Sequence, residues 1–198
     1  MCRAAGFWNA SAALFYRDSR FVGTDIFWSR GNGWAIGALV AAIAHGEADP
    51  HRPEYVKIFQ AHAARLAALA GEDGAWGPSL LNRRDYPLGE TTATAGFVYG
   101  LAFGKGQRSS CPRLRKSKAV KHFQNGQTTE RWAATRTGLN QNLLTPRAHF
   151  LAVVSKGWAF LSSTALQADG LVGYCQPGGG SPVSAALGLA WTLVVGLC

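Results

Sequence analysis

The sequence feature that most constrains the fold is a unit that occurs twice, at residues 54–104 and again at 146–198. Each copy contains an amphipathic helix, then an Asp-Gly loop with an aromatic residue, and then an apolar helix whose first residues are small. Repeated helical hairpins, in which a half-buried helix alternates with a buried one, predict an all-α toroid or barrel. In such a ring the loops that precede the inner helices gather at one end. We expect the functional site there, because helix N-termini favour anionic groups.

Hydrophobic periodicity and turn chemistry locate the individual helices. The apolar run that follows Trp34 predicts a buried inner helix. Residues 29–33 are expected to form a glycine-rich turn that opens this helix and lets another backbone approach closely. The apolar stripe between Tyr55 and Leu69 predicts an outer, half-exposed helix that Gly71 ends. The expected helices span residues 34–45, 55–70, 90–103 and 146–166, with a final apolar helix from Val183 onward.

The net charge of +9 is concentrated in one segment. Residues 105–138 contain nine Lys or Arg side chains and a single acidic one, Glu130. The segment has no periodicity and interrupts a helix, so we interpret it as an insertion that is disordered. The alternative is a functional basic arm that binds nucleic acid or another anionic surface; no nucleic-acid partner is expected. The predicted organisation is hairpins over 1–104, the insertion over 105–138 and a further hairpin over 139–198.

Composition argues against several other classes of protein. The cysteines form no CxxC pair and have no metal-ligand spacing, so neither a disulfide framework nor a metal site is expected. No cofactor is expected either. The apolar runs are too short to span a bilayer, and no membrane partner is expected. No signal peptide follows Met1. Because the chain starts abruptly, we expect the natural domain to begin upstream, and no compartment is assigned.

The candidate binding site is the aromatic and guanidinium cluster at residues 27–34. Arg30 carries a fixed cation whose planar fork suits a carboxylate, and Trp28 offers an indole face for a sugar ring. The alternatives are a structural ion pair for Arg30 and a core position for Trp28. Asn32 and Trp34 are expected to shape the turn and the core, with direct ligand contact as the alternative.

Two further pairs of residues are weaker candidates. Glu90 begins the apolar helix at 90–103, where it is expected either to cap the helix electrostatically or to point toward the pocket. Thr91 follows it and is a weaker candidate of the same kind. Arg17 and Asp18 are expected to form a local ion pair, with a position in the cleft as the alternative.

Several motifs occur in an order that is typical of one family. Together they resemble the C-terminal half of the unsaturated rhamnogalacturonyl hydrolases, glycoside hydrolase family 105, in the six-hairpin glycosidase superfamily. The likeness covers residues 14–104 and 139–186, and it implies a partial (α/α)6 toroid, the C-terminal half of the ring. At Thr92 and Ala93 the chain departs from the Ser and Gly that the family favours. The motifs are Phe15-Tyr16-Arg17-Asp18, Trp28-Ser29-Arg30-Gly31-Asn32-Gly33-Trp34, Asp73-Gly74-Ala75-Trp76, Glu90-Thr91-Thr92-Ala93-Thr94-Ala95, and Asp169-Gly170 with Gln176-Pro177.

The resemblance implies hydration of the C4=C5 double bond in a terminal unsaturated galacturonyl residue linked to rhamnose, in oligosaccharides from pectin. An Asp general acid protonates the alkene, water adds at the neighbouring carbon, and the resulting hemiketal opens to release the sugar. The family needs no metal, and its general acid lies in the other half of the ring. Asp18 is not in the matching position, so no catalytic residue is assigned and the chain is expected to be catalytically incomplete. The alternatives are a non-catalytic uronate-binding protein and another (α/α)6 carbohydrate enzyme. The residues expected to bind substrate are Trp28, Arg30, Asn32, Trp34, Glu90 and Thr91.

Overall fold

The computed structural model describes residues 6–104, 123–124, 127–128, 147–175 and 191–193. Four helices make up most of this part of the chain: α1 (Ser29–His45), α2 (Arg52–Ala68), α3 (Thr91–Gly104) and α4 (Arg147–Phe160). The strands are short and pair in antiparallel twos: β1 (Trp8–Asn9) with β2 (Leu14–Phe15), β3 (Phe123–Gln124) with β4 (Gln127–Thr128), and β5 (Val172–Cys175) with β6 (Trp191–Leu193).

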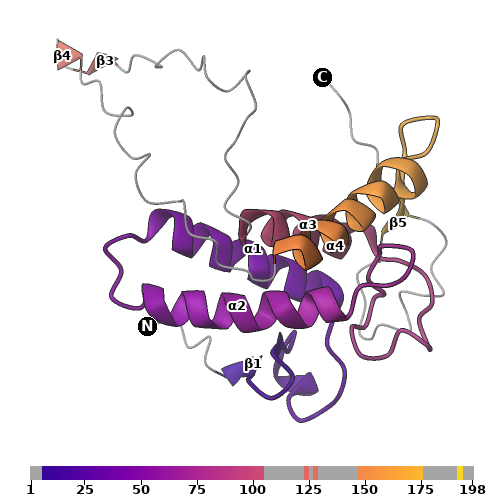
Figure 1. Ribbon diagram of the computed structural model, residues 1–198, viewed down its shortest axis with the longest axis horizontal. Coiled ribbons are helices and arrows are strands. Elements are labelled where there is room, and N and C mark those ends of the chain that lie inside the picture. The colour runs from indigo at the N-terminus through magenta and orange to yellow at the C-terminus, as the bar shows by residue number, and fades with distance from the viewer. Residues whose placement is uncertain (1–5, 105–122, 125–126, 129–146, 176–190, 194–198) are drawn as a thin grey trace.

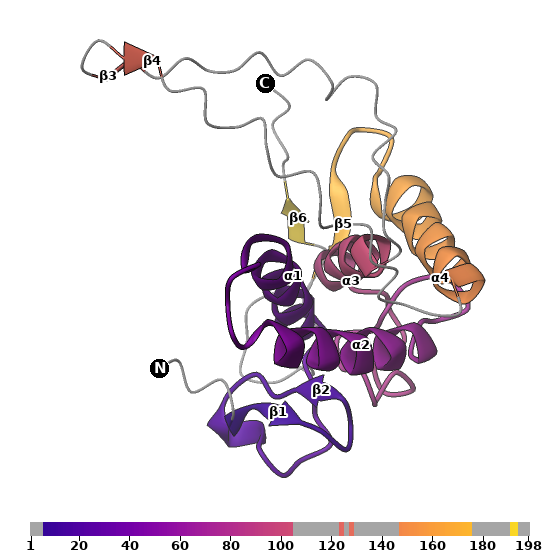
Figure 2. The same cartoon turned by 60° about the vertical axis from the view of Figure 1, so that its left-hand side comes forward.

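The helices pack as consecutive hairpins (Figure 1). Figure 2 shows α1, α3 and α4 side by side in that order, with α2 lying across beneath them and the β1–β2 pair below α2. The helices expected at 34–45, 55–70, 90–103 and 146–166 therefore all exist. The last of them ends differently from the expectation, because α4 gives way to a π-helical turn over Leu161–Ala165.

The outer helix α2 buries one stripe of side chains and exposes the rest. Its buried residues recur at the spacing that one face of a helix presents: Phe59, His62, Ala63, Leu66 and Ala67. Pro53 lies in the first turn, where its missing N–H costs no intrahelical hydrogen bond. The α2 carbonyl of Leu66 also accepts a hydrogen bond (2.8 Å) from the indole N–H of the fully buried Trp76, which ties the following loop to this helix.

The inner helices α1 and α3 approach each other across small residues. A Cβ added to Gly33 would lie 3.3 Å from Ala93 Cα, and one added to Gly96 would lie 3.1 Å from Gly33 Cα. The expected close backbone approach is therefore confirmed at Gly33. It does not hold at Gly31, around which no atom lies within 4 Å of an added Cβ.

Helix α1 begins at Ser29, five residues before the expected start, so the predicted glycine-rich turn at 29–33 is wrong. The cause is a long-range contact. Trp28 is extended and pairs antiparallel with Ser79, flanked by hydrogen bonds from the Ser29 N–H to the Pro78 carbonyl (3.0 Å) and from the Leu80 N–H to the Phe27 carbonyl (2.9 Å). This pairing holds the chain straight up to Trp28, and the helix starts directly after it.

The loop between α2 and α3 packs against α4. Gly74 has a φ of +82° and lies under the Lys156 carbonyl, where an added Cβ would come within 2.3 Å of the oxygen. Gly157 of α4 contacts the loop, because a Cβ there would be 3.4 Å from the Gly74 carbonyl oxygen, and it also packs on α3, because the same Cβ would be 2.6 Å from the Val98 side chain. Gly74 is thus required by the close approach between loop and helix, and Gly157 by the close packing of α4 on α3.

The end of the chain departs from the expectation. Residues 183–190 lie outside the described residues, but Trp191–Leu193 form β6, which pairs with β5, so the final apolar helix is wrong over this stretch. Apart from β3 and β4, the basic segment at 105–138 lies outside the described residues, and its interpretation as an insertion stays a prediction. Among the described helices none is long and apolar enough to cross a bilayer.

Candidate functional site

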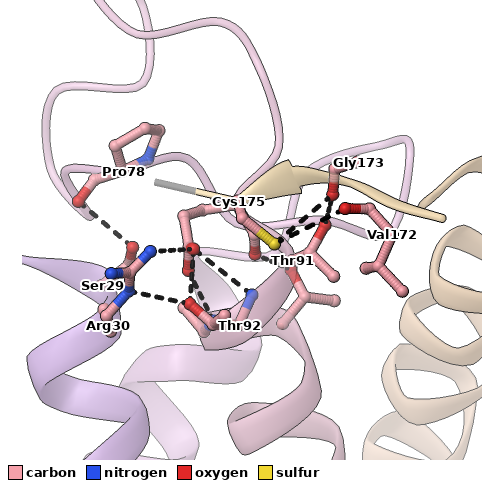
Figure 3. Close-up of polar contacts among 11 residues, drawn as sticks. Ser29, Arg30, Pro78, Thr91, Thr92, Val172, Gly173 and Cys175 are labelled. Atoms are coloured by element: carbon pink, nitrogen blue, oxygen red, sulfur yellow. Dashed lines mark hydrogen bonds and ion pairs between the residues drawn. The ribbon is translucent and has the colours of Figure 1, made fainter. Parts of the chain in front are cut away.

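The candidate site lies where the N-terminal ends of α1 and α3 meet (Figure 3). The Trp28–Ser79 pairing sets the start of α1, and the Ser29 hydroxyl adds a buried hydrogen bond to the Pro78 carbonyl at 3.1 Å. Arg30 follows in the first turn and points toward the start of α3. A single cation thus reaches from one inner helix to the next.

Arg30 forms the ion pair that was the alternative to a ligand-binding role. Its Nη2 donates to Glu90 Oε1 at 3.2 Å, and its Nε donates to the Thr92 hydroxyl at 2.9 Å. The side chain of Arg30 stays 25% exposed, whereas that of Glu90 is 1% exposed. The guanidinium therefore lies at the boundary between the protein interior and solvent.

Glu90 occupies the start of α3 and caps it. One carboxylate oxygen accepts the backbone N–H of Ala93, and the other accepts the backbone N–H of Thr92 (3.3 Å) and its hydroxyl. The expected capping role is therefore what the contacts show. The side chain is directed into the first turn of the helix and not toward solvent.

Thr91 joins α3 to the C-terminal part of the structure. Its hydroxyl donates to the Gly173 carbonyl of β5 at 2.7 Å, in a buried position. Cys175, two residues further along β5, lies beside this contact in Figure 3. Burial raises the pKa of the Cys175 thiol, the Glu90 carboxylate raises that pKa further, and the Arg30 guanidinium lowers it. The pKa of the thiol therefore depends on both charges of the ion pair.

Trp28 and Asn32 are both buried. The Arg17 guanidinium lies 4.3 Å from the centroid of the Trp28 indole, and its Nε pairs with Asp18 at 2.9 Å. The local Arg17–Asp18 pair is thus present. Arg20 also hydrogen-bonds to Asp18, and these contacts lower the pKa of that carboxyl to about 2. Ligand contact by Trp28 or Asn32 stays a prediction.

Trp34 is placed differently from the expectation of a core position. It lies one turn after Arg30 on α1, with 72% of its surface exposed, because the helix begins early and Gly33 takes the position that packs on α3. Residues four apart share a helix face, so Arg30 and Trp34 are neighbours on the surface of α1. A cation and an exposed indole therefore lie together.

The histidines and carboxylates of the described residues form no cluster that could hold a metal ion. His62, on the buried stripe of α2, has its ring nitrogens 3.0 Å from the Ala13 carbonyl and 3.4 Å from the Asn32 carbonyl. Burial lowers its pKa, so the ring is neutral and donates to one of these carbonyls. It joins the β1–β2 pair to α1 and α2.

Sequence reasoning missed Thr92. Its hydroxyl accepts from Arg30 and donates to Glu90, so it bridges the two charges. The sequence did offer one indication of this role. Glycoside hydrolase family 105, which the chain resembles, favours Ser at the position of Thr92, and Ser carries the same hydroxyl group.

The family model of Glycosyl Hydrolase Family 88 matches residues 4–124. A curated relative from Alteromonas sp., an unsaturated 3S-rhamnoglycuronyl hydrolase, is 30% identical over an alignment of 176 residues that covers 85% of this chain and 34% of the relative. A protein of the same name from Formosa agariphila is 38% identical over an alignment of 104 residues that covers 46% of this chain and 28% of the relative. The chain thus spans about a third of the length of the curated relatives that it matches.

A solved structure of a family 88 glycosyl hydrolase from Bacteroides vulgatus superposes with a TM-score of 0.67 at 29% identity, covering 90% of this chain and 44% of that one. A possible family 105 member from Salmonella enterica shares the fold. It superposes with a TM-score of 0.60 at 20% identity, covering 90% of this chain and 39% of that one. The expected resemblance and the all-α, partial (α/α)6 toroid are therefore confirmed. Since the family model covers more than half of its residues, this chain belongs to Glycosyl Hydrolase Family 88.

Proposed function

We propose that this chain contributes the uronate-binding part of a hydrolase that acts on an unsaturated uronyl residue linked to rhamnose. The observation that carries the proposal is the surface pair on α1, in which the partly exposed guanidinium of Arg30 lies one helical turn from the exposed indole of Trp34. A guanidinium suits the carboxylate of a uronate, and an indole suits the apolar face of its ring.

The chemistry that goes with such a site is hydration of the C4=C5 double bond. A general acid gives a proton to C4, and water adds its oxygen to C5 while losing a proton. The resulting hemiketal opens by breaking the ring bond between C5 and O5, which leaves a ketone at C5 and a hemiacetal at C1. The hemiacetal then collapses to an aldehyde and breaks the bond to the released sugar, whose oxygen takes up the proton. Binding the carboxylate on C5 holds the double bond in a fixed place, so Arg30 would orient the reacting carbons.

The names of the curated relatives support the uronyl-rhamnose part of this proposal, because both are called unsaturated 3S-rhamnoglycuronyl hydrolases. The motifs at Trp28–Trp34 and at 90–95 resemble those of glycoside hydrolase family 105, and this resemblance implies a galacturonyl residue derived from pectin instead. The two substrates share the unsaturated uronate carboxylate and differ in the sugars around it. Arg30 and Trp34 fit the shared part.

A binding measurement tests the proposal. An unsaturated galacturonyl-rhamnose disaccharide, titrated into the purified chain by calorimetry, is expected to bind saturably. Arg30→Ala should weaken binding by about 10- to 150-fold, the value of a hydrogen bond to a charged group. Lys57→Ala, which removes one exposed positive charge from the outer helix α2, is the matched control and should bind as the wild type does.

Arg30→Lys refines the result, because it keeps the charge and loses the planar fork. Binding that is unchanged in Arg30→Ala would reject the site. Repeating the titration with a 3S-rhamnoglycuronyl substrate shows which of the two sugars is preferred.

A second candidate function is non-catalytic binding of uronate sugars. The observation that favours it is Glu90, the carboxylate that the described residues place at this site, since it is buried and accepts hydrogen bonds from Arg30, Thr92 and Ala93. A group with these contacts is not placed to protonate an alkene. Loss of alkene absorbance on incubating the disaccharide with the chain alone would show turnover and reject this second candidate.

A further inference from the structure

Arg30 is connected to the start of α3 by a closed set of three hydrogen bonds (Figure 3). Its Nε donates to Thr92 Oγ1 and its Nη2 donates to Glu90 Oε1, while the Thr92 hydroxyl donates to that same Oε1. The Thr92 hydrogen is thereby committed to the carboxylate, so a lone pair of its oxygen is left to accept from Arg30. Two N–H directions of the guanidinium are fixed in this way.

The carboxylate that holds Arg30 is itself fixed. Glu90 is fully buried, and its oxygens also accept the backbone N–H groups of Thr92 and Ala93 in the first turn of α3. A buried carboxylate is costly unless a cation and further donors surround it. Arg30 supplies the cation, so each group restricts the orientation of the other.

We infer that Glu90 and Thr92 are positioning residues, which fix the plane of the Arg30 guanidinium and do not contact the sugar. The inference rests on the proposed function, because the orientation of this plane matters for a uronate carboxylate. Bidentate binding of a carboxylate requires the fork to present one edge in the right plane. A guanidinium that is already held loses less side-chain freedom on binding.

The simpler reading is that Glu90 only caps α3 and that Arg30 only neutralises it. Thr92→Val separates the two readings. It removes the hydroxyl that bridges Arg30 to Glu90 and leaves the hydrogen bond between the Ala93 N–H and Glu90 in place. Thr92→Ser restores the hydroxyl, and Ala95→Val, at an exposed position further along α3, adds the same β-branched side chain without removing any polar group.

The first measurement is the NMR signal of the Arg30 side-chain Nε–H in the full chain, assigned by its loss in Arg30→Lys. A slowly exchanging, resolved signal is expected in the wild type, in Thr92→Ser and in Ala95→Val. The signal should move to the fast-exchanging position of a free arginine in Thr92→Val, which removes the acceptor of the Nε–H. A signal in Thr92→Val that matches the wild type would overturn the inference.

The second measurement is the dissociation constant for the unsaturated galacturonyl-rhamnose disaccharide. Thr92→Val should weaken binding about tenfold, which corresponds to about 1.4 kcal/mol, and Thr92→Ser and Ala95→Val should stay close to the wild type. Unchanged affinity in Thr92→Val, with a released guanidinium, would also overturn the inference. If the wild type binds no uronate, the proposed function fails, and the NMR measurement still decides how Arg30 is held.

Discussion

The side-chain amide of Asn32 pairs with both backbone groups of Phe15, as a neighbouring strand would. Its Oδ1 accepts the Phe15 N–H at 2.8 Å, and its Nδ2 donates to the Phe15 carbonyl at 2.9 Å and to the Trp28 carbonyl at 2.8 Å. The residue is fully buried. The first turn of α1 therefore holds the β1–β2 pair in place through one amide.

Asn32→Leu should destabilise the chain strongly, since it leaves the part-buried N–H and carbonyl of Phe15 without their partner. Each such group costs about 1–3 kcal/mol, so the free energy of unfolding should fall by about 2–4 kcal/mol. Urea unfolding measures the difference. Asn82→Leu, at a half-exposed loop position, is the control and should change stability by less than about 0.5 kcal/mol. Equal effects of the two substitutions would contradict the role given to Asn32.

Gly96 and Gly37 should respond oppositely to alanine. A Cβ at Gly96 would press on the backbone of Gly33, whereas a Cβ at Gly37 meets no atom within 4 Å. We expect Gly96→Ala to destabilise by about 1–3 kcal/mol, because backbone atoms cannot move aside. Gly37→Ala should stabilise by about 0.5–1 kcal/mol through better helix propensity. Thermal unfolding of both variants checks the prediction, and a stabilising Gly96→Ala would show that α1 and α3 are not in close contact.

The Cys175 thiol should report on the ion pair. Its pKa is raised first by burial and then by the Glu90 carboxylate, and it is lowered by Arg30. Removing the negative charge in Glu90→Gln should therefore lower the pKa of Cys175, and removing the positive charge in Arg30→Gln should raise it. Alkylation of Cys175 at a series of pH values, followed by peptide mass spectrometry, gives this pKa separately from the other cysteines. Shifts of the same sign in both variants would show that the electrostatic explanation is wrong.

His62 should make stability depend on pH. Burial lowers its pKa below the ordinary value of 6.5, so the unfolded chain binds a proton at pH values where the folded chain does not. The free energy of unfolding should fall as pH drops below about 6.5, by at most about 1.4 kcal/mol for each unit by which the pKa is lowered. His62→Gln keeps a donor for the Ala13 carbonyl and should remove this part of the pH dependence. Urea unfolding at about pH 7.5 and about pH 5.5 measures it; the same loss in both proteins would exclude His62 as its source.

The helices could be predicted from the sequence because periodicity is a local property. The buried stripe from Phe59 to Ala67 marks α2 without any knowledge of its partner. The start of α1 could not be predicted in this way, since it is set by the pairing of Trp28 with Ser79, which are far apart in the sequence. The strand β6 was missed for the same reason, because an apolar run favours a helix until its partner β5 is known.

The composition of the site could be predicted, but its connections could not. Arg30 and Glu90 were both recognised as candidates, yet nothing local indicates that residues 60 positions apart form a pair. Thr92 was missed because hydroxyl residues are common at helix starts, where they usually serve as caps. Trp34 was expected in the core because tryptophans usually are buried, whereas the close packing at Gly33 turns it toward solvent.

The loop between α2 and α3 is anchored at several points by contacts that do not involve its tip. Arg83 binds both Asp73 and the Ala75 carbonyl, the Glu90 N–H donates to the Trp76 carbonyl, and Ser79 pairs with Trp28. Residues 84–88 take no part in these contacts and are mostly exposed. Insertions and deletions confined to 84–88 would leave the helices undisturbed. Evolution can therefore vary the length and composition of this tip at little structural cost.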